Sequence, residues 1–387
     1  MKKYILAAFA LLLLSCTASS PETSVGKNED SLEKGFEEIM QRNSAVGLQV
    51  AAVKDGKLVY NASFGYKDLE DKTPLGNDDV LRIASISKTF VATAIMQLVE
   101  QGKVDLDADI SDYMGFSIRN PKFPQQPITV RMLLSHTSSM SDANGYFSLD
   151  YLNPSVSATW EKAWNTWEPG SKYQYCNLGY NTLGAIIEIA SGQRFDIYMR
   201  ENLFTPLGVY ASHNVADLNP DKFIGIYQYN SSNSYYTRNE TAYAMPDLEN
   251  YRMGYSTPVF SPTGGVKISA KDLAKAMIMH MNWGRTNDGK QIISEESSRM
   301  MQSEITTTNY EGERYGMAMI STSDLFTDAR ATGHDGLALG AHTAMYWIRE
   351  KNFGVIVMTN GCTAKTDKVF ANILCESADL LKLHLCD

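Results

Sequence analysis

Residues 82–104 read RIASISKTFVATAIMQLVEQGKV, and this stretch carries the strongest local signal in the chain. From Lys88 onward its apolar residues predict a largely buried helix that ends near Gly102. Ser85 and Lys88 are three positions apart, so on a helix their side chains lie on one face. A serine nucleophile needs an adjacent base, and a lysine against an apolar wall can become a neutral amine. The pair suggests a nucleophile with its base, although a capping serine beside a solvated lysine has the same spacing.

The composition describes a folded, acidic protein. The chain has 387 residues, of which 44% are hydrophobic, with 27 Gly and 12 Pro, which excludes a disordered or collagen-like chain. Its 35 Lys and Arg against 44 Asp and Glu give a net charge of −9. Without a basic excess or tract, we expect no nucleic-acid partner. The His residues form no HxH or HExxH pair, so we expect no metal site and no other cofactor.

The first sixteen residues, MKKYILAAFALLLLSC, are typical of an export signal. Two Lys precede an apolar stretch that is too short to span a bilayer. The small residue before Cys16 looks like a bacterial lipoprotein cleavage box, in which a signal peptide of residues 1–15 is removed and Cys16 is lipidated. An ordinary signal peptide with an incidental cysteine is the alternative. Lipid chains on Cys16 would anchor an exported protein to a membrane, facing the periplasm or the cell surface, with residues 16–29 as a polar tether.

The remaining hydrophobic patterns predict an α+β protein. Residues 30–43 have helical spacing, and residues 46–66 alternate around an Asp55-Gly56 turn, which indicates a β-hairpin. A second hairpin is expected within residues 342–361, and an amphipathic helix from Lys365 to the end.

These elements suggest an antiparallel sheet flanked by helices in an α/β lobe of residues 30–108 and 258–387. A mainly helical lobe, residues 109–257, would be inserted into it. Within that lobe, residues 227–255 are rich in Tyr and are either a lid over the site or a surface loop.

Four cysteines follow Cys16 in the sequence. An exported protein meets an oxidising compartment, so a disulfide could form among Cys362, Cys375 and Cys386. The spacing does not select a pair, and unpaired buried thiols fit equally well.

Three further segments follow residues 82–104 in order: ITVRMLLSHTSSM (128–140), PGSKYQYCNLGYNTLGAIIEIASGQ (169–193) and TGHDGLALG (332–340). Together with RIASISKTF they resemble the serine β-lactamase and penicillin-binding protein superfamily. The resemblance covers roughly residues 30–387 and is greatest for the branch of class C β-lactamases, D-alanyl-D-alanine carboxypeptidases, D-aminopeptidases and esterases. The superfamily's S-D-N and K-T-G motifs are replaced here by Tyr175-Cys176-Asn177 and His334-Asp335-Gly336, as in that branch.

The resemblance implies roles for individual residues. Ser85 would attack the acyl carbon, while Lys88 and Tyr175 share its proton. Asn177 would contact a substrate amide or acyl side chain. The oxyanion hole would be the backbone N–H groups of Ser85 and of Leu337, which follows His334-Asp335-Gly336.

Two consequences of this assignment depend on charge. Tyr175 can act as a base only if nearby positive charge lowers its pKa, and Lys88 and His334 are the candidates. Asp335 stands where relatives that recognise a substrate carboxylate commonly have Thr or Ser, and two carboxylates repel. We therefore expect esters, neutral amides or amine-bearing substrates, rather than β-lactams or peptides ending in D-Ala, unless Asp335 points away from the site.

The sequence thus predicts an exported, lipid-anchored serine acyl-hydrolase that cleaves ester or amide bonds of a small-molecule or peptide substrate through an acyl-serine. One alternative is a D-Ala-type carboxypeptidase or β-lactamase. Another is a non-catalytic binding or sensor protein with the same fold.

Overall fold

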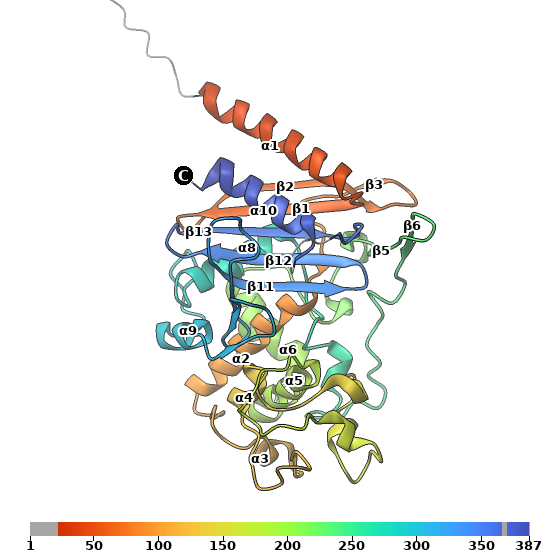
Figure 1. Cartoon of the computed structure of the whole chain (residues 1–387), viewed down its shortest axis with the longest axis vertical. Coiled ribbons are helices and arrows are strands. Elements are labelled where there is room, and N and C mark those ends of the chain that lie inside the picture. The colour runs from red at the N-terminus through yellow and green to blue at the C-terminus, as the bar shows by residue number, and fades with distance from the viewer. Residues whose placement is uncertain (1–21, 366–369, 387) are drawn as a thin grey trace, which may run out of the picture.

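The computed structural model describes residues 22–365 and 370–386. Residues 1–15 and Cys16 lie outside the described residues, so their export and lipidation stay predictions. In the described part, a large antiparallel sheet is flanked by helices (Figure 1), as expected for the predicted α+β class. No helix in this part is long and apolar enough to cross a membrane.

The main sheet has nine strands within the described residues, in the order β3-β2-β1-β13-β12-β11-β10-β9-β8. Every pair of neighbouring strands in it is antiparallel. Two separate strand pairs, β4 with β7 and β5 with β6, complete the described strands. The strands are β1 (Gly47–Lys54), β2 (Lys57–Asp68), β3 (Thr73–Pro74), β4 (Leu81–Arg82), β5 (Tyr227–Asn230), β6 (Tyr235–Arg238), β7 (Lys267–Ile268), β8 (Thr306–Thr307), β9 (Arg314–Tyr315), β10 (Ile320–Thr322), β11 (Ala331–Ala338), β12 (Ala341–Ile348) and β13 (Phe353–Thr359).

The α-helices of the described residues range from one turn to about six turns. They are α1 (Glu22–Arg42), α2 (Ser87–Glu100), α3 (Ile110–Met114), α4 (Val130–Leu134), α5 (Asn177–Ser191), α6 (Phe195–Met199), α7 (Thr205–Leu207), α8 (Ala270–Met281), α9 (Glu295–Gln302) and α10 (Asn372–Leu385). Short 3-10 turns connect several of them, including η1 (Ala84–Ile86) directly before α2.

Both predicted hairpins are confirmed. Strands β1 and β2 are joined through Asp55 and Gly56, whose φ angles of 50° and 73° are those of a type I′ turn. Strands β12 and β13 form the second hairpin, and β13 pairs with β1, so strands from early and late in the described residues lie side by side in one sheet.

Helices cover the two faces of this sheet, because each face is apolar. Helices α1 and α10 pack together on one face, where Leu32 and Phe36 of α1 join a core with Leu381 of α10. Helix α8 covers the other face, and beyond it the core continues into α2 and α5 (Figure 1). In that continuation the Phe90 ring of α2 meets the Phe204 ring edge-on, with centroids 5.4 Å apart.

Two helix boundaries differ from those expected. Helix α1 begins at Glu22, so residues 22–29, expected as part of a tether, are helical. Once Leu32, Phe36 and Ile39 anchor the helix to the sheet, adding residues at its end costs little. Helix α10 begins at Asn372, later than Lys365.

The region predicted to be an inserted lobe, residues 109–257, contains helices α3 to α7. Its Tyr-rich segment holds the β5–β6 hairpin, in which the rings of Tyr229 and Tyr236 lie 5.2 Å apart. One hydrophobic core runs through this region and the sheet lobe.

Within the described residues, the structure contains no disulfide among Cys362, Cys375 and Cys386. Cys362 is a buried free thiol, so no pair that includes it is formed. Cys375 lies near the start of α10 and Cys386 just after its end, roughly 16 Å apart at the rise of an α-helix. This is far beyond the Cα separation that a disulfide spans.

Candidate active site

Ser85 lies in the η1 turn, where the chain enters α2. The preceding residue, Ala84, has a φ of 48°, in the left-handed region that side chains with a Cβ rarely adopt. Such strained residues persist where the surrounding structure holds them, and they are common next to active-site groups. The turn presents Ser85 half-exposed at the edge of a cleft while Lys88 remains buried one helical turn later.

The side chain of Lys88 is fully buried and meets three acceptors. Its Nζ lies 3.0 Å from Ser85 Oγ, 2.9 Å from Asn177 Oδ1 and 2.8 Å from the Thr263 carbonyl. Burial lowers the pKa of Lys88 to about 7, although the negative charge of Asp142 opposes that shift. A neutral amine can donate to Asn177 and Thr263 and direct its lone pair at the Ser85 hydroxyl. The geometry therefore fits Lys88 as the base for Ser85.

Tyr175 lies beside this pair, but not in the form expected from the sequence. Lys88 Nζ is 4.8 Å from the centre of its ring, and its hydroxyl lies close enough to the Ser85 side chain for Ser85 to affect its pKa. Burial raises the pKa of Tyr175 well above its usual value, and the Ser85 side chain offsets only part of this rise. The condition for Tyr175 to act as a base, a pKa lowered by Lys88 and His334, is therefore not met. Burial dominates the pKa of Tyr175, and it also lowers the pKa of His334 to about 3, which leaves that ring neutral. Tyr175 is a phenol that can donate a proton.

Asn177 is held by a residue that the sequence did not single out. Asn177 is the first residue of α5. There the Asp142 carboxylate accepts hydrogen bonds from the backbone N–H groups of Asn177 and Leu178 at 2.9 and 3.0 Å. The same carboxylate accepts from Asn177 Nδ2 at 2.9 Å, which leaves Oδ1 for Lys88 and for the Thr263 hydroxyl. Asp142 thus fixes the orientation of the Asn177 amide. It lies 35 residues earlier in the chain, so no local pattern could have identified it.

Strand β11 brings its predicted residues to the opposite wall of the cleft. A Cβ atom on Gly336 would lie 2.4 Å from the Ile83 carbonyl oxygen, so glycine is required for the strand to approach the segment before Ser85. Strand β10 pairs only with residues 331–333 of β11, so beyond Gly333 that edge has no partner strand among the described residues. Leu337, on this edge, is 64% exposed. A strand edge without a partner leaves backbone N–H groups available to a substrate oxyanion, which is the role predicted for the Leu337 N–H.

Asp335 lines the same cleft together with Glu313, which the sequence did not reveal. Asp335 Oδ1 accepts a hydrogen bond of 3.2 Å from the Tyr346 hydroxyl, and burial raises the pKa of Asp335. Burial also raises the pKa of Glu313 to about 7, and the negative charge of Asp335 contributes. Asp335 therefore faces the cleft rather than a distant loop, and a second acid lies near it.

The cleft has a volume of about 510 Å³ and contains the residues expected to catalyse the reaction. Its walls include Ser85, Tyr175, Asn177, His334 and Leu337. In the described part of the chain, no three His, Cys, Asp or Glu side chains are grouped as metal ligands would be.

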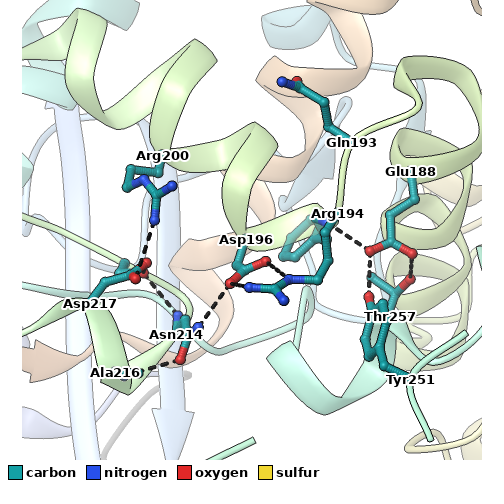
Figure 2. Close-up of polar contacts among 12 residues, drawn as sticks. Glu188, Gln193, Arg194, Asp196, Arg200, Asn214, Ala216, Asp217, Tyr251 and Thr257 are labelled. Atoms are coloured by element: carbon teal, nitrogen blue, oxygen red, sulfur yellow. Dashed lines mark hydrogen bonds and ion pairs between the residues drawn. The ribbon is translucent and has the colours of Figure 1, made fainter. Parts of the chain in front are cut away.

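A buried carboxylate anchors the segment that leads into the Ser261–Gly265 turn next to Lys88. Glu188 of α5 is 1% exposed, and it accepts hydrogen bonds from the Thr257 hydroxyl at 2.8 Å and the Tyr251 hydroxyl (Figure 2). It accepts another from the Gly254 N–H at 2.6 Å. It also accepts from the Phe195 N–H at 2.7 Å. Glu188 thereby ties residues 251–257, at the end of the Tyr-rich segment, to the core.

Comparison with known proteins agrees with this arrangement. The chain matches the Beta-lactamase family over residues 32–375. It is 26% identical over 345 residues to penicillin-binding protein 4 of Amycolatopsis lactamdurans, a match that covers 86% of this chain and 85% of that protein. It is 30% identical over 186 residues to penicillin-binding protein 4* of Bacillus subtilis (strain 168), which covers 46% of this chain and only 40% of that relative's length.

Solved structures show the same fold. The octameric penicillin-binding protein homologue of Pyrococcus abyssi has a TM-score of 0.72 and 25% identity, covering 94% of this chain and 77% of that one. The D-amino acid amidase of Ochrobactrum anthropi SV3, solved with L-phenylalanine amide, has a TM-score of 0.72 at 20% identity, covering 93% and 98%. The family match and these relatives support serine acyl-hydrolase activity in general and confirm the fold expected from the sequence motifs.

The environment of Lys88 predicts the pH dependence of the reaction. Because the base is the neutral amine, and because the pKa of Lys88 is about 7, kcat/KM for a neutral ester should rise with pH and level off above about 7. Lys88→Arg keeps a permanent charge and should lower kcat/KM by about 10²-fold or more at neutral pH. Steady-state kinetics across the pH range measure both effects.

The exposed Lys103, which lies away from the cleft, provides the control. Lys103→Arg should leave the pH profile unchanged. A wild-type profile that is flat through neutral pH would show that Lys88 is not the titrating base.

Proposed function

We propose that this chain, which belongs to the Beta-lactamase family, is an exported serine hydrolase that cleaves ester or amide bonds through an acyl-Ser85 intermediate. The observation that carries the proposal is the contact between the buried Lys88 amine and the Ser85 hydroxyl, at 3.0 Å, on the wall of a cleft that is open to a substrate. The same cleft is lined by Tyr175, Asn177 and His334, whose residue types are those that the proposed chemistry requires.

The acylation step follows from the protonation states of these groups. Ser85 Oγ bonds to the acyl carbon as its proton passes to the neutral amine of Lys88, which becomes an ammonium. The carbonyl oxygen, now negative, accepts hydrogen bonds from the backbone N–H groups of Ser85 and Leu337. The tetrahedral intermediate then collapses as the Tyr175 phenol gives its proton to the leaving oxygen or nitrogen, and the Lys88 ammonium returns a proton to Tyr175.

Deacylation repeats this sequence with water as the nucleophile. A water molecule attacks the acyl carbon and gives its proton through Tyr175 to the neutral Lys88 amine. Ser85 Oγ then leaves the tetrahedral intermediate and takes a proton from the Lys88 ammonium, which releases the acid product and restores the starting state. This route needs Tyr175 only as a phenol that relays protons, as its raised pKa requires.

Covalent labelling of the purified protein tests the proposal. A fluorophosphonate probe should label the wild type and not Ser85→Ala, and p-nitrophenyl esters should be turned over only by the wild type, because the acyl-enzyme needs the Ser85 hydroxyl. Ser171, an exposed serine at the surface, supplies the matched control Ser171→Ala, which should behave as the wild type.

The same experiment separates the alternatives. Rapid labelling by a fluorescent penicillin with slow release would favour the cell-wall peptidase that the names of the relatives suggest. Failure of both probes and of every ester would point to a non-catalytic binding or sensor protein.

We also propose that the substrate bears no carboxylate next to the scissile bond, on the leaving-group side. Asp335 and Glu313 line the cleft together, and, in addition to burial, the negative charge of Asp335 already raises the pKa of Glu313, so a substrate carboxylate next to them would be disfavoured in the same way. Esters, neutral amides and amine-bearing substrates meet no such penalty.

Replacing Asp335 should change this preference. We expect slow hydrolysis of a chromogenic cephalosporin by the wild type, and an increase of about tenfold in its kcat/KM in Asp335→Thr, which removes the charge and supplies a hydroxyl. Spectrophotometric kinetics against a neutral p-nitrophenyl ester measure the change in selectivity. Efficient cephalosporin hydrolysis by the wild type, near the diffusional limit, would reject the proposal.

Export and anchoring are proposed from the sequence of residues 1–16 alone. In cells fed labelled palmitate, the wild-type chain should incorporate label and appear in the membrane fraction. Cys16→Ser should incorporate none, because the thiol that carries the lipid is absent. Cys176→Ser, at a buried cysteine of the folded body, is the matched control and should remain labelled. Labelling of Cys16→Ser at the wild-type level would contradict the anchor.

A further inference from the structure

A second cavity, of about 620 Å³, adjoins the catalytic cleft. The two hollows share Arg82, Phe147 and Ser261 in their walls, so they lie next to each other at these residues. We call this second hollow the side cavity. Lys267 and His213 also line the side cavity.

Lys267 is a buried amine that the proposed mechanism does not use. It is 6% exposed, and its Nζ donates a hydrogen bond of 2.6 Å to the His213 carbonyl. Within residues 22–365 and 370–386, no carboxylate lies within 4.0 Å of Lys267 Nζ, and no acceptor other than the His213 carbonyl forms a hydrogen bond with it. An ammonium has three N–H donors, and burying one without a counter-charge is costly. Two of its donors are therefore available to a ligand.

A second cation faces Lys267 directly. Arg82 of β4 and Lys267 of β7 are register partners on adjacent antiparallel strands, where like charges repel. The Arg82 guanidinium donates to the Gly264 carbonyl at 2.8 Å and to Ser261 Oγ at 3.2 Å, and in the described part of the chain it has no carboxylate partner. Burial, with a contribution from Arg82, lowers the pKa of Lys267 to about 7. An anion placed between the two would relieve the repulsion and would favour the protonated, ammonium form of Lys267.

The acids of the side cavity do not supply that anion. Asp247 is exposed at its mouth, and the Asp150 carboxylate accepts from the Tyr255 hydroxyl. Neither forms an ion pair with Arg82 or Lys267 among the described residues. The basic end of the side cavity therefore lacks a protein counter-charge.

We propose that the side cavity binds a carboxylate at the far end of the substrate's acyl group, so that preferred substrates carry an acyl chain that ends in an anion. This inference rests on the proposed function. The acyl side is favoured because the turn that lines the cavity also holds Asn177, through the Thr263 hydroxyl. On the opposite side, Asp335 and Glu313 would repel the same group.

Two esters of equal chain length test the assignment: p-nitrophenyl hexanoate, whose acyl group is neutral, and mono-p-nitrophenyl adipate, whose acyl group ends in a carboxylate. At one neutral pH the wild type should favour the adipate ester in kcat/KM by about tenfold, as expected for one charge-assisted hydrogen bond. Lys267→Met, which keeps the apolar stem, should abolish that ratio, and Lys267→Arg should retain most of it. Lys271→Met, at a surface lysine paired with Asp78, should keep the wild-type ratio.

The outcomes distinguish this inference from the proposed function. Turnover of both esters without a preference, or a preference that Lys267→Met leaves intact, overturns the side-cavity assignment and leaves the serine hydrolase standing. Absence of turnover and of Ser85 labelling overturns the proposed function instead.

A measurement that needs no turnover covers the case in which Lys267→Met is poorly folded. Free adipate should bind the wild type in calorimetry, while adipamide, its neutral diamide of the same chain length, should bind at least about tenfold more weakly. Raising the salt concentration should weaken adipate binding, since screening reduces the attraction between charges that water can reach. Equal binding of adipate and adipamide, or no binding of adipate, overturns the inference.

Discussion

The active site depends on the buried amine of Lys88 and on the acceptors that the fold must supply to it. A buried polar group without a partner costs free energy, so the protein has to bring oxygen atoms to this amine from elsewhere in the chain. It does so from three places: Ser85 of the adjoining turn, Asn177 at the start of α5, and the carbonyl of Thr263. The arrangement that satisfies the amine is therefore the one that assembles nucleophile, base and substrate contact.

Acidic and basic residues lie in different parts of the cleft and its side cavity, and this separation affects which substrates fit. Asp335 and Glu313 lie on one wall of the cleft, while the cations Arg82 and Lys267 line the adjoining side cavity. Partly buried charges are screened less than surface charges, so their sign affects which group of a substrate each region accepts. The proposed orientation of the substrate and the proposed anion site both follow from this division.

Local sequence patterns predicted helices and strands correctly where neighbouring residues alone determine the structure. The Asp55-Gly56 turn and the alternation around it predicted the β1–β2 hairpin, because only such residues adopt a type I′ turn easily. The same patterns did not predict that α1 starts at Glu22, since helix propagation depends on packing farther along. Whether the pKa of Tyr175 is lowered, as a role as base requires, could not be predicted, because its burial is not visible in the sequence.

By itself the sequence determined the family and the fold class, and its four ordered motifs predicted the reacting groups on Ser85, Lys88, Tyr175 and the His334–Leu337 strand. Only the tertiary structure decided their protonation states, because burial and neighbouring charge set a pKa and both arise from distant residues. It also decided which residues support them: Asp142 orients Asn177, Glu188 anchors residues 251–257, and Lys267 meets Arg82 across β4 and β7. These contacts join residues far apart in the chain, so no spacing along the sequence encodes them.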